Sequence, residues 1–158
     1  MADDPIYEEE VSSGRTEALF VGLMLTFLML FAWRAAAIGI GPSTIVFFCL
    51  FSMFLFYSLN YRTLVIRITT KIVRLKFGLF TWSIPLGTIE DCRLDTASLW
   101  RIGGAGIHFT IMQKRYRAMF NFLEHRRLVL MLRKKKGLVR EIAFSTKRPE
   151  EIKRIITL

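Results

Sequence analysis

Two groups of cationic side chains are the residues of this sequence best suited to chemistry, and the chemistry they suit is the binding of anions. The first group lies within six residues of chain: Lys71, Arg74 and Lys76. The second group is consecutive: Arg133, Lys134, Lys135 and Lys136. Near an anionic membrane surface each lysine or arginine contributes roughly 1 kcal/mol of attraction. Both groups are therefore candidates for binding lipid headgroups or an acidic partner, and the alternative for the second group is a solvated turn.

Residues that could carry catalysis are few. His108 and His125 are the only histidines, and we expect His108 on a strand, at the surface or satisfied internally. Glu90, Asp91 and Asp95 could bind a cation, but ion pairs with nearby arginines are the preferred interpretation. The sequence contains no phosphate-binding loop, HExxH motif or nucleophile elbow. We therefore expect no enzymatic activity, no cofactor and no metal.

A long apolar segment must hold these charged residues in place. Residues 18–61 contain a single charged side chain, that of Arg34. About 20 helical residues cross the hydrocarbon layer of a membrane, so this segment is long enough for two crossings. Gly39, Gly41 and Pro42 predict the turn between them. We expect a transmembrane helical hairpin over residues 16–61.

Four residues of the hairpin are expected at the membrane interfaces: Trp33, Arg34, Tyr57 and Tyr61. Tryptophan and tyrosine favour the headgroup level, and a long arginine side chain can extend outward to reach it. We expect Arg34 to extend in this way beside Trp33. The alternative is that Arg34 pairs with a carboxylate of a neighbouring membrane subunit.

The charge of the chain is divided unevenly. Residues 1–61 contain two basic against six acidic residues, whereas residues 62–158 contain 21 basic against seven acidic residues. Cytoplasmic flanks of membrane helices are enriched in lysine and arginine, so we expect both termini in the cytoplasm and the hairpin in the inner (cytoplasmic) membrane. Anionic lipid headgroups are then the nearest partners. We expect no nucleic acid, because no aromatic and basic platform is evident.

Three segments follow from these observations. Residues 1–15 are acidic and polar, and we expect a disordered cytoplasmic tail. The alternative is that Pro5, Ile6 and Tyr7 dock on a basic surface, which could be that of the chain's own domain. Residues 16–61 form the hairpin, and residues 62–158 form one small domain. Cys49 and Cys92 fall in different segments and are expected to be free thiols.

From residue 63 onward the apolar pattern has the two-residue period of β-strands. Short alternating runs such as LVIRI, KIVRLKF, GIHFTIM and RLVLMLR recur with polar turns between them. Pro149 predicts the start of a C-terminal helix, in which Ile152, Ile155 and Ile156 form an apolar stripe. We expect a membrane-anchored α+β protein: a hairpin, then an antiparallel β-barrel or sandwich of about seven strands with a C-terminal helix.

Four motifs occur in order along this domain: IPLGTIEDCRL at 84–94, SLWRIGGAGIHF at 98–109, Phe120-Asn121, and FSTKRPEEIKRII at 144–156. In their order and spacing they resemble bacterial membrane proteins that carry a pleckstrin-homology-like (PH-like) domain behind a transmembrane hairpin. The resemblance covers residues 16–156. One departure is Ala105, which follows the glycine pair where an aromatic residue is frequent in the family.

The resemblance implies a binding module that acts in membrane recruitment, scaffolding or complex assembly. Some bacterial members accompany photosynthetic or respiratory membrane complexes. We therefore expect a non-catalytic accessory or scaffold subunit, with its hairpin packed against other integral-membrane subunits and its domain on the cytoplasmic face. The alternative is a stand-alone membrane-anchored module that binds anionic lipid or recruits a cytoplasmic protein.

Overall fold

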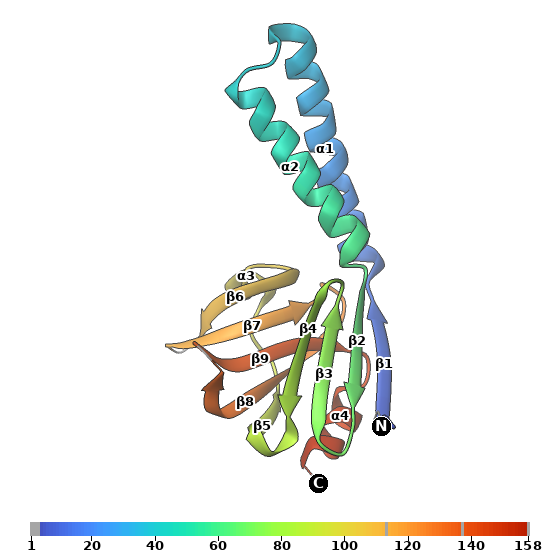
Figure 1. Ribbon diagram of the computed structural model, residues 1–158, viewed down its shortest axis with the longest axis vertical. Helices are drawn as coiled ribbons and strands as arrows, with labels where there is room; N and C mark the ends of the chain where they lie inside the picture. Colours follow the sequence, from blue (N-terminus) through green and yellow to red (C-terminus); the bar gives the residue numbers. More distant parts are fainter. Residues whose placement is uncertain (1–3, 113, 137, 158) are drawn as a thin grey trace. The chain divides into compact units, whose positions relative to one another are not determined.

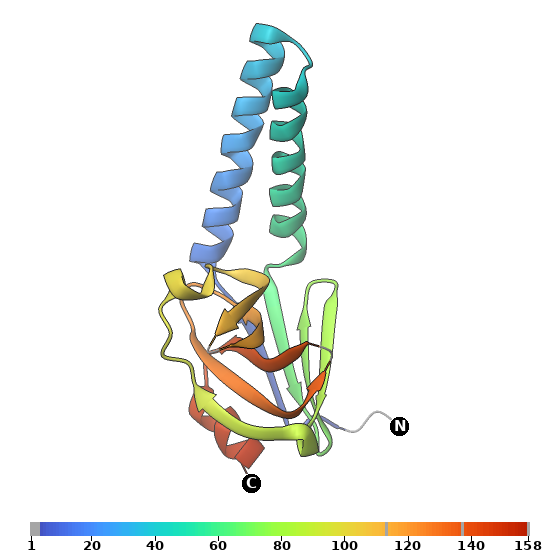
Figure 2. The same cartoon turned by 90° about the vertical axis from the view of Figure 1, so that its left-hand side faces the viewer.

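The computed structural model describes residues 4–112, 114–136 and 138–157, apart from the side chains of residues 99, 100 and 134–136. The chain forms two compact units. Residues 14–62 are a helical unit, and the segments on either side of it together form a β-rich unit (Figures 1 and 2). The helical unit is thus inserted into the sequence of the β-rich unit.

The helical unit is an antiparallel pair, α1 (Gly14–Ile38) and α2 (Pro42–Asn60). Gly39 adopts a positive φ of 87° at the turn and Pro42 occupies the first turn of α2, as the sequence predicts. Aromatic rings join the helices: Phe27 stacks on Phe54 with ring centroids 5.5 Å apart, and Phe20 lies 5.6 Å from Tyr57. Both helices are long and apolar enough to cross a membrane.

Four strands form the first sheet of the β-rich unit, here called sheet A. It consists of β1 (Tyr7–Ser12), β2 (Thr63–Ile68), β3 (Ile72–Phe77) and β4 (Phe80–Pro85). The strands are paired in that order, each antiparallel to the next. Ser12 pairs with Thr63, so the chain leaves the sheet for the helical unit and returns to it on the neighbouring strand.

The structure has a strand where the sequence predicts a disordered N-terminal tail: residues 7–12 pair with β2 of the chain's own β-rich unit, whereas Ile6 is 57% exposed. The buried residue Glu9, which is 8% exposed, holds this acidic segment in the β-rich unit through its carboxylate. It accepts hydrogen bonds from the Tyr7 hydroxyl at 3.0 Å, the Lys147 backbone N–H at 2.7 Å and the Thr146 hydroxyl. Burial and the hydrogen bond to Glu9 raise the pKa of Tyr7, which keeps its hydroxyl available as a donor.

Five strands form the second sheet, sheet B. They are β5 (Ile89–Leu94), β6 (Gly106–Met112), β7 (Arg115–Asn121), β8 (Arg126–Lys136) and β9 (Val139–Thr146), arranged in the order β5-β8-β9-β7-β6. The pairing of β7 with β9 is parallel. About seven strands are expected after residue 62, and the described part of the chain has eight there, β2 to β9. The expectation of an antiparallel arrangement is wrong for one pair, because β9 inserts between β8 and β7 and runs parallel to β7.

The core lies between the two sheets, whose strands cross one another in Figure 1. In sheet A every second residue of β2 and β3 is completely buried, and sheet B contributes Leu128, Leu130, Ile142 and Phe144. Phe77 meets Phe122 at 5.2 Å and Trp82 meets Phe120 at 6.0 Å, both in edge-to-face contacts. The C-terminal helix, α4 (Pro149–Thr157), contacts β5 and β8 and buries Ile152, so its predicted start and apolar stripe are confirmed.

The face of sheet B that points away from sheet A is also covered. A short helical turn, η1 (Leu86–Thr88), leads into β5, and the connection from β5 to β6 contains α3 (Leu99–Ile102). Ile102 is completely buried there against Met119, Val129 and Ala143. This connection therefore creates a second, smaller core on the side of sheet B that faces away from sheet A.

Candidate anion-binding site

The outer face of sheet A gathers basic side chains. In the antiparallel register Arg67 lies opposite Arg74, and Val65 lies opposite Lys76, which in turn lies opposite Thr81. These five residues line an open concavity of about 340 Å³. Residues directly opposite one another on one face of a sheet have neighbouring side chains. The sheet thus brings Arg74 and Lys76 together, as the sequence predicts, and adds Arg67 to them.

The alternation of β2 and β3 is what directs these charges outward. Leu64, Ile66 and Ile68 alternate with Val65 and Arg67, and all three are completely buried. A shift of register by one residue would exchange the two faces, so burial of the apolar face fixes the basic face on the outside.

The cations of this face differ in what they contact. Arg67 forms an ion pair with Glu8 of β1 at 2.8 Å, and both side chains are about half exposed. Within the part of the chain that the structure describes, Arg74 and Lys76 make no ion pair. Lys71 is exposed at the turn between β2 and β3, outside the lining of the concavity. Arg74 and Lys76 are therefore the cations best placed to receive an anion.

The second predicted basic group lies at the far end of β8. Arg133 is exposed, and the side chains of Lys134, Lys135 and Lys136 lie outside the described part of the structure. The strand continues to Lys136, which pairs with Val139. The three lysines therefore belong to the end of a strand, and the connection to β9 is shorter than the sequence suggests.

The expected membrane-interface residues occupy both ends of the helical unit. Trp33 is 62% exposed, and the guanidinium carbon of Arg34 lies 5.9 Å from the centre of its ring. Arg34 also donates a hydrogen bond of 3.0 Å to the hydroxyl of Ser43 in α2. At the other end Tyr57 is half-buried and Tyr61 is buried, and the centroids of their rings lie 4.8 Å apart.

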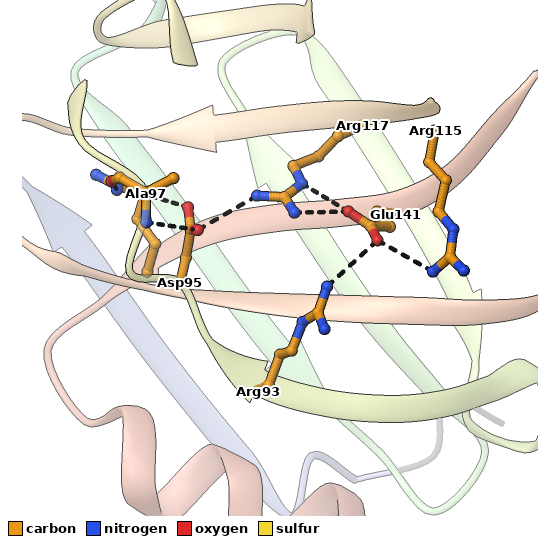
Figure 3. A network of polar contacts seen from close by, with 7 residues as sticks. Arg93, Asp95, Ala97, Arg115, Arg117 and Glu141 are labelled. Atoms are coloured by element: carbon orange, nitrogen blue, oxygen red, sulfur yellow. Dashed lines mark hydrogen bonds and ion pairs between the residues drawn. The ribbon is translucent and has the colours of Figure 1, made fainter. Parts of the chain in front are cut away.

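Sheet B carries a network of buried charges that links β5, β7, β8 and β9 (Figure 3). The Glu141 carboxylate, whose side chain is 1% exposed, accepts two hydrogen bonds from Arg117 at 2.8 and 2.6 Å. Arg117 also approaches Asp95 at 3.3 Å, and Asp95 accepts a hydrogen bond of 2.9 Å from Arg127. Arg93 and Arg115 approach the second oxygen of Glu141 at 3.4 and 3.6 Å.

This network agrees with the preferred interpretation of Asp95 as an ion-pair partner, but its centre was not predicted. Glu90 lies 4.0 Å from Arg140, a weak contact between partly exposed groups. Glu141 and Arg117 each occupy a strand position that alternates with apolar residues, which is the pattern of a solvent-facing side chain. They are buried because the β5–β6 connection covers this face, and strand alternation carries no signal of that cover.

The residues considered for catalysis have structural contacts. A ring nitrogen of His108 contacts the carbonyl oxygen of Ile102, and one of His125 lies 2.7 Å from the carbonyl oxygen of Ser12. Cys49 and Cys92 are both free, and burial raises the pKa of the Cys92 thiol to about 11. Among residues 4–112, 114–136 and 138–157, no group of three or more His, Cys, Asp or Glu side chains is arranged to hold a metal ion.

An apolar patch lies at the edge of sheet B. Ile111 of β6 pairs with Tyr116 of β7, and Phe109 lies on the same face two residues before Ile111. Their exposed fractions are 62% for Phe109, 61% for Ile111 and 43% for Tyr116. The sequence predicts the alternation of β6, and the structure leaves Phe109 and Ile111 of this face exposed.

Compared with models of known protein families and with curated proteins, the sequence matches none of them. The class of protein is therefore defined by the fold and the contacts described above. It is an α+β protein with two helices able to cross a membrane and a two-sheet domain that bears a basic face.

Proposed function

We propose that this protein is a non-catalytic, membrane-anchored binding module whose basic face on sheet A associates with anionic lipid headgroups on the cytoplasmic side of the inner membrane. The observation that carries the proposal is the convergence of Arg67, Arg74 and Lys76 on one open concavity. Arg74 and Lys76 have no carboxylate partner in the described part of the chain, so binding an anion would not require breaking an internal ion pair.

The topology of sheet A supports the orientation. β1 and β2 flank the helical unit and pair with each other, with Ser12 opposite Thr63. If α1 and α2 cross a bilayer, the segments on either side of them must lie on the same side of it. The excess of lysine and arginine in the segment after α2 favours the cytoplasm for that side.

The architecture is also compatible with a PH-like domain, because two sheets enclose the core and a helix follows the last strand. Two features depart from the expected pattern, namely the N-terminal strand β1 and the parallel pairing of β7 with β9. Since a fold does not define a function, the proposal depends on the basic face and not on the resemblance.

Vesicle binding by the β-rich unit tests this proposal. The protein is prepared with residues 13–62 replaced by Asn-Gly, and sedimentation is compared between neutral phosphatidylcholine vesicles and vesicles that also contain phosphatidylserine. Substituting Arg74→Gln with Lys76→Gln should weaken binding to the anionic vesicles by about 2 kcal/mol, or roughly thirtyfold. Added salt should weaken the binding of the unsubstituted protein, since exposed charges are screened.

A matched control separates the basic face from net charge. Arg126→Gln with Arg154→Gln removes the same charge from two exposed positions elsewhere, on β8 and α4. This pair should change binding much less than the pair on sheet A. Equal losses from both pairs, or equal binding to neutral and anionic vesicles, would contradict a defined lipid-binding face.

The second candidate function is that of an accessory or scaffold subunit of a larger integral-membrane complex, and the apolar patch of Phe109, Ile111 and Tyr116 favours it. Apolar residues grouped on a soluble surface often mark a protein interface. Purification from native membranes in mild detergent, followed by mass spectrometry, should recover partner subunits that are lost with Phe109→Ser and Ile111→Ser. A monodisperse protein without partners would exclude this function.

A further inference from the structure

A second cavity lies on sheet B, on the face covered by the β5–β6 connection. Its volume is about 460 Å³, within the range of small-molecule sites. Its lining comes from the end of β5, the segment that follows, α3, β6 and β7, and it includes Arg93, Asp95, Thr96, Ser98, Arg101 and Arg117. Three of these side chains are arginines and one is a carboxylate, so the cavity is cationic.

The charged network that forms part of the cavity wall carries more positive than negative charges. Four guanidinium groups, those of Arg93, Arg115, Arg117 and Arg127, surround only two carboxylates in the described network, those of Asp95 and Glu141 (Figure 3). Arg101 adds a further positive charge to the lining. The buried charges balance, with Arg117 and Arg127 against Asp95 and Glu141. The surplus cations, Arg93, Arg115 and Arg101, are partly or fully exposed to solvent, where they can attract an anion.

Hydrogen bonding within the network leaves donors unused at the rim. Glu141 and Asp95 hold Arg117, which is 5% exposed, in place through three nitrogens. Arg93 contacts Glu141 through one terminal nitrogen at 3.4 Å, and its side chain is 43% exposed. In the described part of the chain Arg101 forms no ion pair. Arg93 and Arg101 can therefore donate to a ligand while Arg117 stays fixed.

We propose that this cavity binds a phosphomonoester, with Arg93 and Arg101 as the main binding groups and Arg117 as a fixed cation at its wall. Arginine forks suit the oxygens of a phosphate group, and the tetrahedral phosphate accepts hydrogen bonds from several directions. Thr96 and Ser98 also line the cavity and supply hydroxyl donors. The cavity is larger than a phosphate ion, which leaves space for the group that carries the phosphate.

Such a phosphomonoester could be a water-soluble metabolite or the headgroup of a lipid, and one experiment with two arms separates them. The full-length protein is placed in phosphatidylcholine nanodiscs and titrated calorimetrically with glycerol 3-phosphate. In the second arm, the thermal unfolding midpoint is compared between nanodiscs with and without phosphatidic acid. Saturable heat in the first arm indicates a soluble ligand. A raised midpoint in the second arm alone indicates a lipid headgroup, and either result supports the cavity.

Arg101→Gln is the decisive variant. In the described part of the chain Arg101 forms no ion pair with a carboxylate, so this substitution leaves the buried network intact. It should weaken the observed binding at least tenfold. Arg126→Gln, which removes an exposed arginine of β8 outside the cavity, should leave binding unchanged. Absence of binding in both arms would overturn the proposal. So would binding that is insensitive to Arg101→Gln, or binding that is lost with Arg74→Gln and Lys76→Gln on sheet A instead.

Discussion

At the scale of single residues, two buried glutamates determine how the β-rich unit is held together. Glu9 joins β1 to the end of β9 through two hydrogen bonds, from Thr146 and from the Lys147 backbone, and Glu141 joins β9 to β7 through Arg117. Both carboxylates are more than nine-tenths buried. A buried charge is tolerated only when its hydrogen-bond partners are complete, so both positions should be sensitive to substitution.

Removing the partner of Arg117 should be strongly destabilising. Glu141→Leu would leave the buried Arg117 guanidinium with only the 3.3 Å contact to Asp95, and we expect a loss of about 3–5 kcal/mol in unfolding free energy. The double variant Arg117→Met with Glu141→Leu should lose less than the sum of the two single variants, because neither charge then lacks its partner. Equilibrium unfolding in mild detergent, followed by tryptophan fluorescence, measures this cycle. Additive losses would show that the pair is not coupled.

Cys92 should titrate far above an ordinary thiol. Burial raises its pKa to about 11 from an unfolded value of 9.0, so the unfolded state loses its proton first and the folded state is destabilised as pH rises between these values. In a Cys49→Ala background, alkylation of the native protein by iodoacetamide should remain slow at pH 9 and accelerate towards pH 11. The urea-unfolded protein should react with a midpoint near pH 9. Identical pH profiles would contradict the burial of this thiol.

At the scale of elements, strand β1 determines which residues an isolated β-rich domain must contain. It covers the edge of β2 over six residue pairs and supplies Glu9 to the end of β9. A fragment that begins after the helical unit would expose that edge and lose those contacts. The domain is therefore built from two separate pieces of sequence.

Joining these two pieces directly should give a soluble, folded domain. Ser12 and Thr63 are paired, so replacing residues 13–62 by Asn-Gly makes β1 and β2 an ordinary two-residue hairpin. We expect this protein to unfold cooperatively and to be several kcal/mol more stable than the fragment 63–158, because burial of Glu9 and Tyr7 is retained. Urea denaturation followed by circular dichroism compares the two. Equal stability would mean that β1 contributes nothing to the fold.

At the scale of the whole molecule, local patterns in the sequence predict most elements and few of their relations. The two apolar helices, the turn at Gly39 and Pro42, the strands after residue 63 and the helix from Pro149 all follow from periodicity and capping. The strand of β1 does not, because consecutive glutamates disfavour strands and their partners lie far along the chain. The position of β9 between β8 and β7 likewise depends on packing.

The candidate sites, too, could be predicted from the sequence only in part. Arg74 and Lys76 could be found from the sequence, because residues two apart on a strand share a face. Their neighbour Arg67 belongs to the site through strand register, and the cavity on sheet B depends on a connection that covers a face with the pattern of a solvent-exposed surface. Long-range pairing and loop cover are properties of the folded chain, and single-strand patterns do not record them.

The insertion of the helical unit between two paired strands has a consequence for the order of events during synthesis. β1 leaves the ribosome first, but its partner β2 follows about 50 residues later, after both helices. Closing so long a loop is entropically costly for a flexible chain. Pairing of α1 with α2 brings Phe20 beside Tyr57 and Glu17 within 3.3 Å of Arg62, so the two ends are already close when β2 appears. Pairing of the two helices would thus act as the nucleating step for the β-rich unit.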